Sequence, residues 1–132
     1  MATVFTKIIS GEIPCFKIAE TENFLAFLDI SPLKEGHTLV IPKIEVDNIF
    51  DLDDELLAEM HVFTKTVAKA IEKSFDCKKV GMAVVGLEVP HAHIHLLPIN
   101  EVSEMDFSQE KMPHSRMTFV MVMERIKEAL NS

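Results

Sequence analysis

Residues 91–97 read His91-Ala92-His93-Ile94-His95-Leu96-Leu97, with three histidines at strict two-residue spacing inside an apolar segment. In an extended strand, successive side chains point to opposite faces of the sheet. We therefore expect the three imidazoles on one face and the apolar residues between them on the other. Such a strand packs against a core with one face and presents chemically active groups with the other.

The segments around this stretch predict the rest of the fold. Runs of β-branched and aromatic residues bounded by turn residues are typical of strands, and apolar residues at three- and four-residue spacing are typical of helices. The predicted strands are about Cys15–Glu20, Phe24–Asp29, His37–Ile41, Lys79–Val85 and His91–Ile99, and the predicted helices are about Thr3–Ser10, Asp53–Phe75 and Ser115–Leu130. Short links suit hairpins better than crossovers. We therefore expect an α+β fold with an antiparallel five-stranded sheet, one long helix and two shorter helices.

The length and composition of the chain limit the classes of protein that it can be. A chain of 132 residues fits one domain, which we expect to span residues 1–132. No apolar run approaches the roughly 20 residues that span a bilayer, and the N-terminus lacks the parts of a secretory signal. We expect a cytoplasmic protein without a membrane partner. The net charge of −8 argues against a general nucleic-acid binder, although a small anionic ligand could be held by locally placed donors.

Three histidines in register allow two kinds of chemistry, beside a purely structural polar strand. Imidazole is a common zinc ligand, but a strand rises about 13 Å from residue 91 to residue 95, whereas zinc lies about 2.1 Å from each nitrogen. The outer two histidines can therefore hardly share one ion. Alternatively, the neutral imidazole of His93 can attack phosphorus and form a phosphoramidate intermediate. His91 and His95 are suited to orient that ring and to donate hydrogen bonds to phosphate oxygens.

The residues resemble the histidine triad (HIT) family, whose signature is His-x-His-x-His followed by two apolar residues. Three upstream segments extend the similarity. They are Val4–Pro14, which resembles the opening helix and turn, Phe24–Pro32, which resembles the nucleoside-binding segment, and Gly36–Lys43, which resembles the strand that supplies a fourth histidine. The similarity covers about residues 3–99. Residues 100–132, predicted to be a loop and a C-terminal helix, carry none.

The resemblance implies a nucleotide-binding hydrolase or nucleotidyltransferase that needs no cofactor and dimerises through its long helix and an adjacent strand. It would act through a nucleotidyl-histidine at the α-phosphorus of a purine nucleoside phosphoramidate, acyl-nucleotide or dinucleoside polyphosphate. The implied catalytic residues are His93 as the nucleophile, His95 as a phosphate contact, and His91 and His37 as supports. The implied substrate-binding residues are Asp29 at the ribose and Val4, Phe5, Ile8, Phe27 and Ile30 around the base.

The loop before the triad departs from the family pattern. Many relatives carry a Gly-Gln-Ser or Gly-Gln-Thr run there that binds phosphate, whereas this chain has Gly86, Leu87 and Glu88. An apolar side chain and a carboxylate therefore replace two phosphate donors. This departure keeps open a nucleotide-binding or interaction module with little catalysis. A metal-dependent hydrolase also stays open, because two of the three histidines could bind one ion together with a ligand from elsewhere in the chain.

A second departure concerns zinc. Some bacterial relatives hold a structural zinc with a Cys-x-x-Cys pair at the first helix and a histidine after the third strand, whereas this chain has Thr3, Thr6 and Glu45 at those places. The thiolates that zinc prefers are missing. We therefore expect no structural zinc, and we assign no metal ligand among the site residues.

Overall fold

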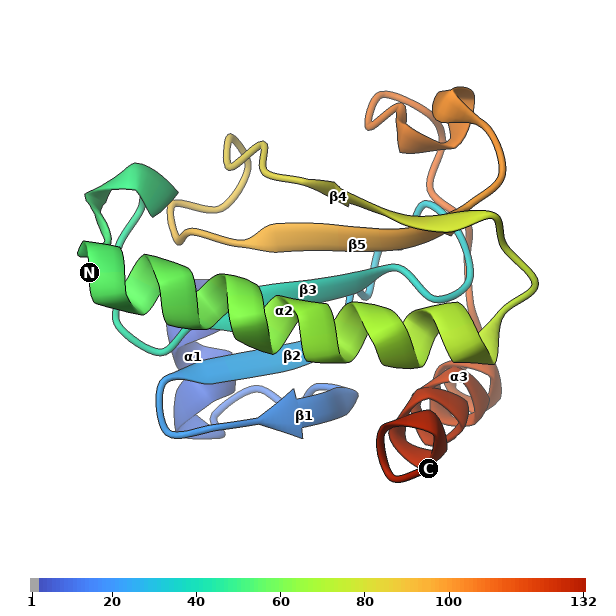
Figure 1. The fold of residues 1–132 in the computed structure, drawn as a ribbon, viewed down its shortest axis with the longest axis horizontal. Coiled ribbons are helices and arrows are strands. Elements are labelled where there is room, and N and C mark those ends of the chain that lie inside the picture. Colours follow the sequence, from blue (N-terminus) through green and yellow to red (C-terminus); the bar gives the residue numbers. More distant parts are fainter. Residues whose placement is uncertain (1–2) are drawn as a thin grey trace.

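Five antiparallel strands form one sheet in the computed structural model, which describes residues 3–132 (Figure 1). The strands are β1 (Lys17–Glu20), β2 (Phe24–Leu28), β3 (Thr38–Pro42), β4 (Lys79–Ala83) and β5 (Ile94–Ile99). Their order in the sheet is β1-β2-β3-β5-β4, and every neighbouring pair is antiparallel. The expected α+β fold is confirmed.

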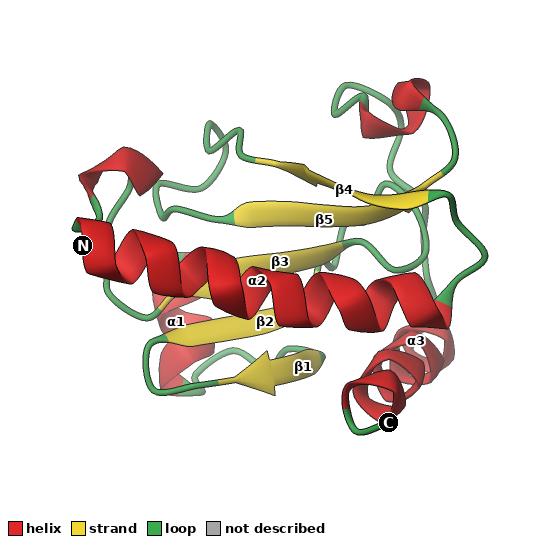
Figure 2. Cartoon of the chain, viewed as in Figure 1, coloured by secondary structure: helices red, strands yellow, loops and turns green. Residues whose placement is uncertain are grey.

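Three α-helices and two short 3-10 turns complete the fold (Figure 2). They are α1 (Val4–Ser10), η1 (Ile49–Asp51), α2 (Asp54–Ser74), η2 (Val102–Met105) and α3 (Arg116–Leu130). The α-helices begin at the polar caps Thr3, Asp53 and Ser115, whose side chains accept backbone N–H groups of the first turn. Helix α1 ends at Gly11 with φ of 87°, a left-handed conformation that glycine adopts without strain. No described helix is both long and apolar enough to cross a bilayer.

The sheet separates two apolar clusters. Figure 1 shows α2 across one face of the sheet and α1 behind the other. Ala92, Ile94 and Leu96 belong to the larger cluster, together with buried residues of α2 and α3. Phe5 of α1 belongs to the smaller cluster on the opposite face, and its ring lies 5.1 Å from that of His93. The two-residue alternation therefore does direct the histidines away from the large core.

Strand β5 is shorter than expected, because it begins at Ile94 and not at His91. The backbone N–H groups of the residues before it bond outside the sheet: His91 donates to the Val89 carbonyl at 2.8 Å and Ala92 to the Val46 carbonyl at 2.7 Å. The partner strand β4 ends at Ala83, opposite His95. The first histidine of the triad therefore lies in an extended approach to the strand.

Candidate active site

A cavity of about 220 Å³ opens on the α1 side of the sheet, with His93 and His95 in its wall. All six residues expected to bind substrate line it: Val4, Phe5, Ile8, Phe27, Asp29 and Ile30. Further wall residues that sequence reasoning did not assign to the site are Ile13, Pro14, Cys15, Ser31, Leu39 and Val89, and the wall also includes Glu88 of the loop before the triad. The alternation along β3 could have identified Leu39, since it shares a sheet face with Ile41. His91 and His37 are buried behind the wall and do not line it.

The ring of His93 is oriented by its own strand. Its Nδ1–H donates to the backbone carbonyl of His91 at 2.7 Å, and a carbonyl can only accept. The proton of the neutral ring is therefore on Nδ1, and Nε2 keeps its lone pair. The side chain is 5% exposed, so this lone pair belongs to a nearly buried ring with restricted access to solvent.

A chain of hydrogen bonds defines the tautomer of His95. The Leu33 backbone N–H donates to His37 Nδ1 at 3.0 Å, so the neutral ring of His37 carries its proton on Nε2. That Nε2–H donates to His95 Nδ1 at 2.9 Å. The remaining proton of neutral His95 is therefore on Nε2, which makes this nitrogen a hydrogen-bond donor. The centroids of the His95 and His93 rings are 4.9 Å apart.

Burial keeps both of these rings neutral at physiological pH. It lowers the pKa of His37 to about 4, with smaller contributions from the charges of Lys111 and His93. It lowers the pKa of His95 to about 3, where His37 and His93 also contribute and the carboxylate of Asp29 opposes the shift. In the hydrogen-bond chain from the Leu33 N–H to His95, the rings of His37 and His95 therefore each carry a proton on one nitrogen only.

His91 connects the site to helix α1. Its Nε2–H donates to the Pro42 carbonyl at 2.8 Å, and its Nδ1 faces the Thr3 hydroxyl at 3.4 Å. Thr3 Oγ1 lies 3.1 Å from Thr6 Oγ1, which donates to the Glu45 carboxylate at 2.5 Å. The three positions where some relatives carry zinc ligands therefore do come together beside His91. Two neutral hydroxyls and a carboxylate do not suit a structural zinc, which favours thiolate and imidazole.

Asp29 lies next to the buried histidines at the end of β2. Its Oδ1 accepts the Ser31 backbone N–H at 2.8 Å, and its Oδ2 lies 3.6 Å from His37 Nε2. Asp29, His37 and His95 offer possible metal-ligand atoms within 4.8 Å of one another. The hydrogen bond between His37 and His95 already uses two of these atoms, so an ion at this place and that bond are alternatives.

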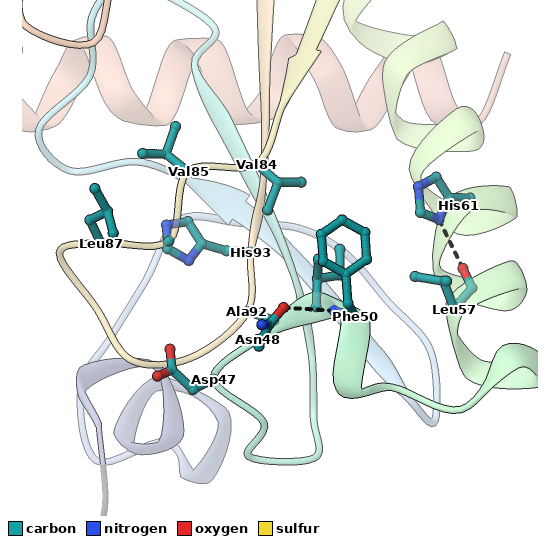
Figure 3. Close-up of a pocket in the computed structure, with 12 residues that line it drawn as sticks. Asp47, Asn48, Phe50, Leu57, His61, Val84, Val85, Leu87, Ala92 and His93 are labelled. Atoms are coloured by element: carbon teal, nitrogen blue, oxygen red, sulfur yellow. Dashed lines mark hydrogen bonds between the residues drawn. The ribbon is translucent and has the colours of Figure 1, made fainter.

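A second, larger cavity of about 620 Å³ lies on the other side of the loop before the triad (Figure 3). Figure 3 shows Val84, Val85 and Leu87 on that loop, and Phe50 of η1 and Leu57 of α2 also line the cavity. Two of these residues are unusually exposed for large apolar side chains, Phe50 at 83% and Leu87 at 88%. His93 lines both cavities, so the candidate nucleophile lies between them.

Among residues 3–132, no lysine or arginine lines either cavity. The smaller cavity carries the carboxylates of Asp29 and Glu88, and the larger one carries Asp47. A phosphate-bearing ligand could meet imidazoles, backbone N–H groups and the side chains of Ser31 and Asn48 as donors on these walls. The lack of lysine and arginine adds to the loss of side-chain donors at Leu87 and Glu88.

Comparison with known proteins gives a consistent picture. The sequence model of one protein family, described as the HIT domain, matches residues 10–102. The chain is 40% identical over 99 residues to adenosine 5'-monophosphoramidase hnt1 of Schizosaccharomyces pombe, and the match covers 74% of each chain. A solved Hit-like protein from Bartonella henselae superposes with a TM-score of 0.84 at 29% identity, covering 96% of this chain and 95% of that one. A zinc-bound histidine triad protein from Mycobacterium smegmatis has a TM-score of 0.83 at 30% identity, with coverages of 99% and 94%.

Proposed function

This chain belongs to the HIT family, and from that premise we propose that it is a nucleotide hydrolase or nucleotidyltransferase that works through a nucleotidyl-His93 intermediate. The substrate is a purine nucleoside phosphoramidate, acyl-nucleotide or dinucleoside polyphosphate. The single observation that carries the proposal is the pairing of two differently protonated rings, since His93 offers a lone pair where neighbouring His95 offers a proton.

Each ring has one role in the proposed reaction. The His93 Nε2 lone pair forms a bond to the α-phosphorus, and the leaving group departs with the electron pair of its bond to phosphorus and takes up a proton from water. The His95 Nε2–H donates to a non-bridging phosphate oxygen and stabilises the charge that develops there. Attack of a water molecule on the phosphorus then breaks the N–P bond, whose electron pair returns to His93 Nε2, and the water loses a proton to solvent as the nucleoside monophosphate is released.

The smaller cavity suits a nucleoside. Asp29 has one carboxylate oxygen bonded to the Ser31 N–H, while Oδ2 can accept from a ribose hydroxyl. The apolar walls around Phe5 and Phe27 can hold a flat base without a specific hydrogen bond, so they would accept adenine or guanine. The similarity to the adenosine 5'-monophosphoramidase of Schizosaccharomyces pombe favours an amine as the leaving group.

Release of AMP from an adenosine phosphoramidate, with and without chelator, tests the proposal. We expect release that is unaffected by chelation, because the proposed steps need only the two imidazoles. Loss of activity on chelation and recovery with zinc would favour metal-dependent hydrolysis at Asp29, His37 and His95 instead. AMP binding without any release would favour a nucleotide-binding module.

We also propose that two copies of the chain associate through α2 and β4. Strand β4 is an edge of the described sheet, so its outer backbone groups are free to pair. Exposed apolar side chains occur on β4, on the loop that follows it, on η1 and on α2, namely Phe50, Val62, Met82, Val84, Val85 and Leu87. A second copy on this face would cover the larger cavity beside His93.

Sedimentation at micromolar concentration checks the association. We expect a dimer in the wild type and a shift toward monomer in Met82→Asp, because a carboxylate on the exposed face of β4 would be desolvated in the interface. A wild-type monomer under these conditions would contradict the proposed association.

A further inference from the structure

The segment Asp106–Pro113, here called the strap, lies beside the buried histidines but outside the residues that match the HIT domain. It follows η2 and leads to α3. The ring of Phe107 packs against His95 with a centroid distance of 4.6 Å and against His37 at 6.3 Å. The strap therefore forms part of the surroundings of the proposed phosphate-binding ring.

Hydrogen bonds hold the strap at both of its ends. The Met112 backbone N–H donates to the Pro32 carbonyl at 2.7 Å, and the next residue, Leu33, donates to His37. Before the strap, Glu104 pairs with Lys34 at 2.5 Å and its carbonyl accepts from Gln109 at 3.0 Å. The position of Lys111, next to Met112, is therefore fixed relative to the site by backbone contacts.

Lys111 adds a positive charge to the strap, whereas the described walls of the two cavities contain no lysine or arginine. The Lys111 backbone lies between Phe107, which packs on His95, and Met112, which bonds to Pro32, the residue after Ser31 in the wall of the smaller cavity. In agreement with this position, the charge of Lys111 contributes to lowering the pKa of both His37 and His95. Lys111 is exposed, and none of the salt bridges found among residues 3–132 involves it. An anion bound at His95 would be attracted by the charge of Lys111 and repelled by the carboxylate of Glu88 in the cavity wall.

We propose that Lys111 of the strap is a substrate-binding residue that contacts the phosphate of the bound nucleotide beside His95. It supplies the charge that the Leu87 and Glu88 side chains do not supply. The inference rests on the proposed function, because it presumes that the nucleotide phosphate lies at His95. The strap thus connects the part of the chain without family similarity to substrate recognition.

Calorimetric titration with AMP and with adenosine tests the role of Lys111. In Lys111→Gln we expect AMP to bind about tenfold or more weakly, the loss typical of a hydrogen bond to a charged group, while adenosine affinity stays unchanged. Lys111→Arg keeps the charge and should keep most of the AMP affinity. Lys127→Gln removes an exposed lysine from the last turn of α3, outside the strap, and is the matched control.

The outcomes separate this inference from the function on which it rests. Equal AMP affinity in wild type and Lys111→Gln, or an equal loss for AMP and adenosine, overturns the role of Lys111 and leaves His93 catalysis untouched. Absence of AMP binding in the wild type would contradict the proposed function itself. Raised salt should shrink the difference between wild type and Lys111→Gln, because the contact is between exposed charges.

Discussion

His93→Ala should lose at least about 10⁴-fold in kcat with an adenosine phosphoramidate, while it binds AMP about as tightly as the wild type. Loss of a nucleophile removes the whole two-step path, and such losses are commonly of this size or larger. AMP binding should persist because the nucleoside contacts proposed for Asp29 and the apolar walls do not depend on the His93 ring. Steady-state kinetics and calorimetry on the same preparation measure both quantities.

Added imidazole provides the control for a merely structural effect of His93→Ala. A small neutral imidazole can enter the space left by the side chain and attack phosphorus in its place. We expect imidazole to restore part of the turnover in His93→Ala and to have no effect on the wild type. If turnover in the variant stays within tenfold of the wild type without imidazole, His93 is not the nucleophile.

His95→Phe should lose about 10²- to 10³-fold in kcat, the effect expected when one preorganised donor to a developing charge is removed. The phenyl ring keeps the shape of the imidazole but has no Nε2–H, and it leaves the His37 Nε2–H without its acceptor. His95→Gln should be less severe, because its amide N–H can reach the position of the lost donor. Comparison of kcat and KM for the two variants separates loss of the donor from loss of the ring.

The two substitutions of His95 together decide between a donor and a packing role. Packing against Phe107 would be disturbed more by Gln than by Phe, so a structural role predicts the opposite order of activities. Higher activity in His95→Phe than in His95→Gln would therefore contradict the assignment of His95 as a hydrogen-bond donor to phosphate.

Alternation and turn residues were sufficient to predict most of the fold. The period of two along residues 91–97 correctly separated the imidazoles from Ala92 and Ile94, because that separation depends only on extended backbone geometry. The first residue of β5 could not be predicted in the same way. The N–H groups of His91 and Ala92 bond to carbonyls of Val89 and Val46, and the contact with Val46 depends on how the chain folds back.

The site was predicted less completely than the fold. Family similarity named residues of the smaller cavity, but the tautomers of His37 and His95 depend on the Leu33 N–H, a backbone group that no side-chain pattern reveals. The strap has no periodicity, so nothing in its sequence predicts that Phe107 would pack on His95. The larger cavity likewise arises from the packing of η1, α2 and the loop that contains Leu87.

Rapid base-quenched mixing with an adenosine phosphoramidate, followed by intact and peptide mass analysis under basic conditions, tests nucleotidyl-His93 formation most directly. We expect a transient adduct of one adenylyl group per chain, labile in acid, located on His93, formed before AMP appears and insensitive to chelator. Turnover without such an adduct, or an adduct on another residue, would contradict the mechanism proposed here.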